Sequence, residues 1–209
     1  MTFPEDPDRE LRRLHRRAAT DMAARMRLPA WEHLSLPLAA PMGHLRVADL
    51  LRRVVEANVA FAALLLGQSP PDSPAGSPPE LPTGSASVSA DPVTEVIESI
   101  RTVLTVVRGL DPDQGFSPEL RIRFWQRIAE LTVLGHDLQQ AIGSGAGVDD
   151  LLVDRLASVA PDVTVWPNLG AIAIPDDEPV DVTTAVLARH GRPRGRILVP
   201  SDNCATGTC

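Results

Sequence analysis

The chain of 209 residues contains no lysine and no tyrosine, and only 3% of its residues are aromatic. The absence of lysine excludes a Schiff-base amine and the lysine of a phosphate-binding P-loop, and the absence of tyrosine excludes a catalytic phenol. No run of about eighteen apolar residues is present, and the segment up to Glu10 is acidic and contains proline. We therefore expect neither a membrane span nor a secretory signal, and a cytoplasmic location.

Cysteine is missing from the chain except at its C-terminal end, where Cys204 and Cys209 lie. A small disulfide scaffold needs more bridges than one pair can form, and a buried structural thiol would be expected within the core. The sulfur chemistry of this chain is therefore confined to its last residues.

Basic residues are also in the minority, with 20 against 27 acidic residues and a formal net charge of −7. We expect no dominant basic face, which argues against DNA or RNA as the main partner. The hydrophobic content of 44% is ordinary for a chain that buries a core. At roughly 150 residues per domain, the length fits one domain with appendages.

Apolar residues recur every three or four positions in four segments, and this spacing predicts four amphipathic helices. The segments are 8–27, 47–65, 93–108 and 118–142. Asp91 and Ser117 are expected to cap the third and fourth helices, and a glycine follows each of the last three. Residues 30–43 contain prolines and are expected to form a loop. Shorter helices are expected over 148–158 and 180–190.

Residues 68–92 are rich in proline, serine and glycine, which predicts a semi-rigid linker between the second and third helices. Four helices with one long crossover describe an all-α four-helix bundle. We expect this domain over residues 8–192, with the linker inside it and a small C-terminal extension. From Gly191 onward arginine alternates with proline and glycine. Residues 193–209 are predicted to be a flexible basic linker and a disordered tail.

Three segments resemble the DinB-like, mycothiol-dependent maleylpyruvate isomerase superfamily, in particular its actinobacterial metal-binding-protein branch. They are VADLLRRVVEANVAFAALL at 47–65, ELTVLGHDLQQAIG at 130–143 and IPDDEP at 174–179. The resemblance extends over residues 8–192 and implies an up-down-down-up four-helix bundle. In that family a histidine on the second helix, and a carboxylate and a histidine four residues apart on the fourth, bind a divalent metal.

The corresponding positions differ in this chain. With Asp49 and Asn58 at the family's spacing, the second-helix histidine falls on Arg53; Glu130 is retained, but Leu134 follows four residues later. A guanidinium cannot ligate a metal, and leucine has no donor atom. The resemblance therefore implies a vestigial site without a metal or another cofactor. An internal ion pair between Arg53 and Glu130 is expected there.

One alternative metal site would use His44, His136 and Glu130. A separation of six residues, however, places Glu130 and His136 about 120° apart around a helix. The remaining histidines lie in polar stretches and are expected on the surface: His15, His33 and His190.

The C-terminal segment combines hydroxyl groups with both thiols: Ser201, Cys204, Thr206, Thr208 and Cys209. This composition resembles the core of a ribosomally synthesised and post-translationally modified peptide (RiPP) of the thioether-forming, lanthipeptide-like classes. The resemblance implies that Ser201, Thr206 and Thr208 are dehydrated and that the thiolates of Cys204 and Cys209 add to the resulting alkenes. In several such families a C-terminal cysteine, here Cys209, is also oxidatively decarboxylated.

The first interpretation is therefore a non-enzymatic precursor whose folded domain is a large leader gripped by modifying enzymes. Its implied partners are a dehydratase, a cyclase, a decarboxylase and a leader protease, without nucleic acid or membrane, and the mature peptide could be exported. Two other classes stay open: a mycothiol-dependent or thiol-dependent isomerase or S-transferase, and a scaffold that binds a small molecule. The tail could also stay unmodified, form a disulfide or bind a soft metal. A homodimer is left open.

Overall fold

A computed structural model of the chain describes residues 6–27, 31–38, 45–68, 91–145, 147–159 and 181–192. The part described is helical and contains no strand, which confirms the all-α prediction there. The α-helices are α1 (Pro7–Arg25), α2 (Val47–Leu65), α3 (Pro92–Gly109), α4 (Pro118–Ile142), α5 (Asp150–Ala157) and α7 (Val182–Arg189), and a short 3-10 helix, η1, spans Trp31–Ser35. No helix in these ranges is long and apolar enough to cross a membrane.

The ends of the long helices are fixed by local side chains. The carboxylate of Asp91 accepts a hydrogen bond from the Val93 amide (3.3 Å) at the start of α3, and the Ser117 hydroxyl accepts one from Leu120 (3.1 Å) at the start of α4. Both predicted caps are therefore confirmed, and each is followed by a proline that already has a helical φ. Gly143 ends α4 with a φ of 66°, a left-handed conformation that glycine adopts without strain.

Several helix ends differ from the sequence-based expectation by one or two residues, and two differences are informative. Residues 31–35, expected within a loop, form η1 ahead of the antiparallel bridge between Pro37 and Arg46. Gly109, expected just beyond the third helix, is the last residue of α3 itself. Propensity is a weak guide at such ends because tertiary contacts can extend a helix by a residue.

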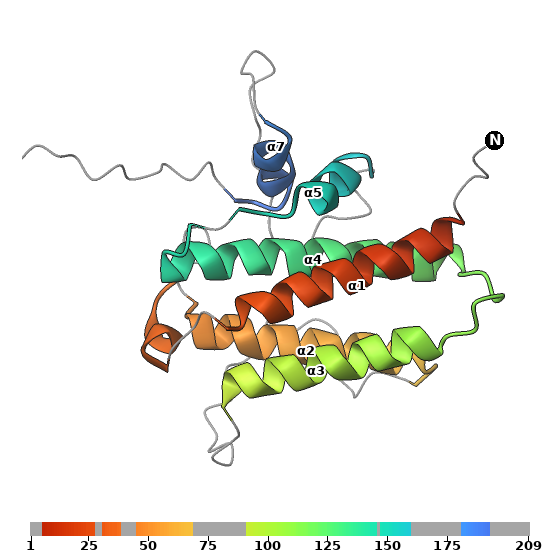
Figure 1. Ribbon diagram of the computed structural model, residues 1–209, viewed down its shortest axis with the longest axis horizontal. Coiled ribbons are helices and arrows are strands. Elements are labelled where there is room, and N and C mark those ends of the chain that lie inside the picture. Colours follow the sequence, from red (N-terminus) through yellow and green to blue (C-terminus); the bar gives the residue numbers. More distant parts are fainter. Residues whose placement is uncertain are drawn as a thin grey trace, which may run out of the picture.

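The four long helices lie side by side, as Figure 1 shows. The closest pairs are α1 with α4 and α2 with α3, and looser contacts join α1 to α3 and α2 to α4. In the view of Figure 1, α1 and α4 run from right to left, whereas α2 and α3 run from left to right. The end of α2 and the start of α3 therefore lie at opposite ends of this pair, as the expected crossover requires. Most of the expected linker, residues 69–90, lies outside the described residues.

Helix α4 lies at the centre of the packing because α1, α2 and α5 all contact it. Leu134, one of the positions predicted to belong to a vestigial metal site, is fully buried in this core. Its companions on α4 are likewise almost completely buried: Phe124, Ile128, Leu131 and Leu138. Helices α5 and α7 pack on each other above α4 in Figure 1, on the side away from α2 and α3. Residues of α4 therefore face neighbouring helices on several sides.

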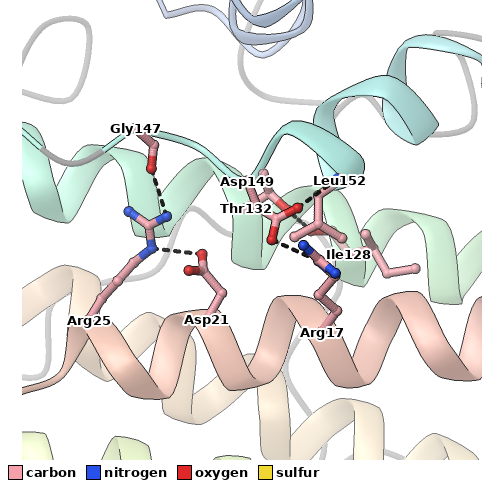
Figure 2. A network of polar contacts seen from close by, with 8 residues as sticks. All are labelled: Arg17, Asp21, Arg25, Ile128, Thr132, Gly147, Asp149 and Leu152. Atoms are coloured by element: carbon pink, nitrogen blue, oxygen red, sulfur yellow. Dashed lines mark hydrogen bonds and ion pairs between the residues drawn. The ribbon is translucent and has the colours of Figure 1, made fainter.

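Arginines of α1 bind the segment between α4 and α5, as Figure 2 shows. Arg25 donates hydrogen bonds to the carboxylate of Asp21 (2.7 Å) and to the carbonyl oxygen of Gly147 (3.0 Å). Arg17 donates to Asp149 (2.7 Å), whose other oxygen caps α5. These contacts hold the start of α5 against α1.

Gly135 allows α1 to approach α4 at this point. A Cβ atom at this position would lie 3.1 Å from Cδ of Arg25 and 3.6 Å from the sulfur of Met22. Even an alanine at this position would require the Arg25 side chain to shift by a few tenths of an ångström.

Candidate functional site: buried ion pairs around α4

Arg53 of α2 faces Glu130 of α4, as the sequence led us to expect. Arg53 Nε lies 3.9 Å from Glu130 Oε1, and the two side chains are 43% and 11% exposed. Burial lowers the pKa of the Arg53 guanidinium, and the charge of Glu130 opposes that shift. The distance and the exposure of Arg53 make this a loose pair.

The tighter partner of Glu130 is Arg127, one turn earlier on α4, which the sequence pattern alone did not identify. Arg127 is 3% exposed, and its Nη1 donates a short hydrogen bond to Glu130 Oε2. Its Nη2 donates to the side-chain oxygen of Asn58 (2.6 Å) and to the carbonyl oxygen of Val54 (3.2 Å). Burial lowers the pKa of the Arg127 guanidinium, while Glu130 acts to raise it. Glu130 therefore supplies the charge that permits a cation in this interior.

The same network continues to α3. Asn58 donates from its amide nitrogen to the Ser99 hydroxyl (2.9 Å), and Ser99 donates to the carbonyl oxygen of Val96 (2.8 Å). One chain of hydrogen bonds thus connects α4, α2 and α3. A network that crosses three helices in this way fixes their register against one another.

The residues at this position do not fit a divalent metal. Arg127 and Arg53 direct two cationic groups toward Glu130, and Leu134 offers no donor. Nowhere in the described ranges does a group of three or more His, Cys, Asp and Glu side chains come together to hold an ion. His44, which the alternative site would need, lies outside the described residues. The arrangement is suited to holding helices together rather than to ligation or proton transfer.

His15 is the clearest departure from expectation, because it lies in the core rather than on the surface. The side chain is completely buried, and neither ring nitrogen has a hydrogen-bond partner in the part of the chain described. Its ring centre lies 5.3 Å from that of Phe61 and 5.6 Å from that of Phe124. Burial, and to a smaller extent the charge of Arg127, lowers the pKa of His15 to about 3.

This lowered pKa predicts a pH-dependent stability. The unfolded chain binds a proton at His15 below pH 6.5, whereas the folded chain resists doing so down to about pH 3. His15 therefore removes about 1.4 kcal/mol of unfolding free energy per pH unit as the pH falls through that window, and nothing above it. In urea titrations, the stability of His15→Leu relative to wild type should be constant above pH 7 and rise by this slope below pH 6. Parallel curves for the two chains would contradict the buried, neutral histidine.

A second buried ion pair joins Arg192, the last of the described residues, to α4. Arg192 is 4% exposed, and its Nε donates to both carboxylate oxygens of Asp137 (2.9 and 3.1 Å). Its Nη2 donates a short bond to the same carboxylate, and its Nη1 donates to the carbonyl oxygen of His190 (2.6 Å). Asp137 therefore holds Arg192 in the interior, although this arginine lies in the stretch from Gly191 onward in which arginine alternates with proline and glycine.

The other described histidines are more buried than their polar neighbours suggest. His190 is buried, which corrects the expected surface position, and burial lowers its pKa to about 4, assisted by Arg192. His33 is half-buried in η1, and so also departs from a surface position. His136 is half-buried, and burial lowers its pKa, although Asp137 opposes the shift.

The residues expected to be modified lie outside the described part of the chain: Ser201, Cys204, Thr206, Thr208 and Cys209. The structure therefore describes the positions predicted to be vestigial and the ion pair of Arg192, but not residues 193–209. No known family model, curated protein or solved structure matches the chain. The resemblances to the DinB-like superfamily and to peptide precursors remain predictions from the sequence.

Proposed function

We propose that the chain is a non-enzymatic precursor, in which a DinB-like four-helix bundle is the leader for a modified peptide in residues 193–209. The observation that carries the proposal is the anchoring of Arg192. Its guanidinium is held by Asp137 in the interior, directly before the segment that contains every thiol of the chain. A firm attachment of the last described residue before this segment suits a leader that positions a peptide for enzymes.

The interior of the helical domain also favours this role over catalysis. Glu130, the retained residue of the family's metal site, is bound by Arg127 and faced by Arg53. A carboxylate whose oxygens are engaged by one guanidinium group and faced by a second is not available to ligate a metal or to act on a substrate. We therefore expect partner enzymes to recognise the domain and to catalyse the bond-making steps themselves.

Dehydration and thioether closure in the tail need no oxidant. A dehydratase activates the hydroxyl of Ser201, Thr206 or Thr208, which leaves as one water together with the α-hydrogen of the same residue. The thiolate sulfur of Cys204 or Cys209 then bonds to the β-carbon of the alkene, and the α-carbon takes up a proton. Each dehydration therefore lowers the mass by one water, and each thioether consumes a thiol without a further mass change.

Mass spectrometry of the C-terminal fragment from cells that contain the modifying enzymes tests the proposal. We expect the fragment to be lighter than its sequence mass by one water per dehydration and to be inert to iodoacetamide. Cys204→Ala and Cys209→Ala should each remove one ring and leave the melting temperature unchanged, because the core of the domain contains no cysteine. An unmodified fragment with two alkylatable thiols would favour the isomerase, S-transferase or scaffold interpretation instead.

A further inference from the structure

Five arginines line a single groove between α1 and α3. Arg9, Arg12, Arg13 and Arg16 follow one another at helical spacing on α1, and Arg108 lies across from them on α3. The groove has a volume of about 590 Å³. That volume is in the range of small-molecule pockets, and no acidic residue contributes to the lining.

The rest of the lining is apolar, and one of the arginines is held in place. Leu104 and Val107 of α3 complete the groove. Arg12 donates to the carbonyl oxygen of Asp111 (2.8 Å), and its guanidinium carbon lies 4.7 Å from the ring centre of Phe116. The groove thus presents a fixed cation next to an apolar surface.

Among the described residues, three of the five charges have no anion to balance them. Arg9, Arg16 and Arg108 are exposed and form no ion pair or hydrogen bond within the described part of the chain. Like charges on facing helices repel one another, and an anion placed between them converts that repulsion into attraction. In a chain with a net charge of −7, such a concentration of cations marks a local site for an anionic ligand.

We propose that this groove binds a phosphorylated small molecule with an apolar group. Guanidinium groups present paired N–H donors that match the oxygens of a phosphate, and several such groups can share its charge. The apolar part of the ligand would lie on Leu104 and Val107. Binding in this groove involves no residue of the tail and does not depend on the precursor function.

The test measures binding of phenyl phosphate, inorganic phosphate and citrate to the full chain by calorimetry, together with the shift in melting temperature. We expect phenyl phosphate to bind most tightly and to raise the melting temperature by several degrees, with inorganic phosphate and citrate weaker by about tenfold or more. The double variant Arg16→Gln/Arg108→Gln should lose the binding and the thermal shift. Without ligand it should melt at or above the wild-type temperature at low salt, because repulsion in the groove is reduced.

The matched control is Arg52→Gln/Arg123→Gln, which changes the net charge equally but replaces exposed arginines outside the groove lining. This control should bind phenyl phosphate as wild type does. The proposal is overturned if wild type binds no phosphate ester, if the control loses binding equally, or if citrate binds as tightly. It is also overturned if a short RNA or DNA strand competes at lower concentration than the phosphate ester, since the groove would then belong to a nucleic-acid surface.

Discussion

Replacing Glu130 by alanine should lower the free energy of unfolding by about 3–5 kcal/mol, because the substitution leaves a buried cation without its anion. Arg127 would keep its bonds to Asn58 and Val54, but neither of these neutral groups balances its charge. The Nε of Arg127 already lacks a hydrogen-bond partner among the described residues, and Arg53 would add a second cation nearby. Urea unfolding, with the midpoint and the slope both reported, measures the loss.

Two comparisons make this expectation specific. Glu98→Ala removes an exposed glutamate of α3 and should change stability by no more than about 0.5 kcal/mol. The double variant Arg127→Met/Glu130→Leu removes both charges and should be much closer to wild type than Glu130→Ala. EDTA should leave the wild-type midpoint unchanged. A loss below about 1 kcal/mol for Glu130→Ala would show that Arg127 is not held in this interior by Glu130.

The second large effect is expected at Arg192. Arg192→Ala leaves the buried carboxylate of Asp137, near the C-terminal end of α4, without its cation, which should cost about 3–5 kcal/mol. The loss should be accompanied by faster amide hydrogen exchange in α7, because Arg192 follows directly on that helix. Hydrogen-exchange mass spectrometry and urea unfolding together separate undocking of α7 from global destabilisation.

A neighbouring arginine supplies the control. Arg189 of α7 donates one hydrogen bond to the carbonyl oxygen of Ala157 (3.3 Å), so Arg189→Ala should cost only about 1 kcal/mol. The double variant Asp137→Ala/Arg192→Ala removes both charges and should be more stable than Arg192→Ala alone. If the double variant instead loses the sum of the two single losses, the two side chains do not interact as the structure shows.

Features decided by neighbouring residues could be predicted from the sequence. The four long helices follow from the spacing of apolar residues, and the caps at Asp91 and Ser117 follow from side chains that bond within their own first turn. The Arg53–Glu130 contact could also be predicted, because the family resemblance implies that both positions face the same interior site. The start of η1 and the last residue of α3 could not be predicted, since both depend on packing.

Buried polar residues were missed for a definite reason. His15 and Arg127 both lie on the apolar face of their helices, three or four residues from Leu11 and Phe124. This register was the available signal, but their polar character suggested the surface instead. Arg192 gave no such signal, because its partner Asp137 is 55 residues away and is brought near only by the fold.

The overall composition of the chain gave no indication of the arginine groove. A net charge of −7 led us to expect no dominant basic face, yet four of the lining arginines come from α1 alone. Their spacing of three and four residues from Arg9 to Arg16 is visible in the sequence. The contribution of Arg108 from α3 is not, because it depends on how the two helices pack.

Whether the helical domain presents the tail for modification is tested most directly by comparing the full chain with residues 193–209 alone. Each is produced together with the modifying enzymes, and the mass of the C-terminal fragment is measured. We predict that the fragment from the full chain loses the mass of one or more waters and both free thiols, whereas the isolated tail keeps its sequence mass. Equal modification of the two, or an unmodified tail in the full chain, would contradict a leader role for the folded domain.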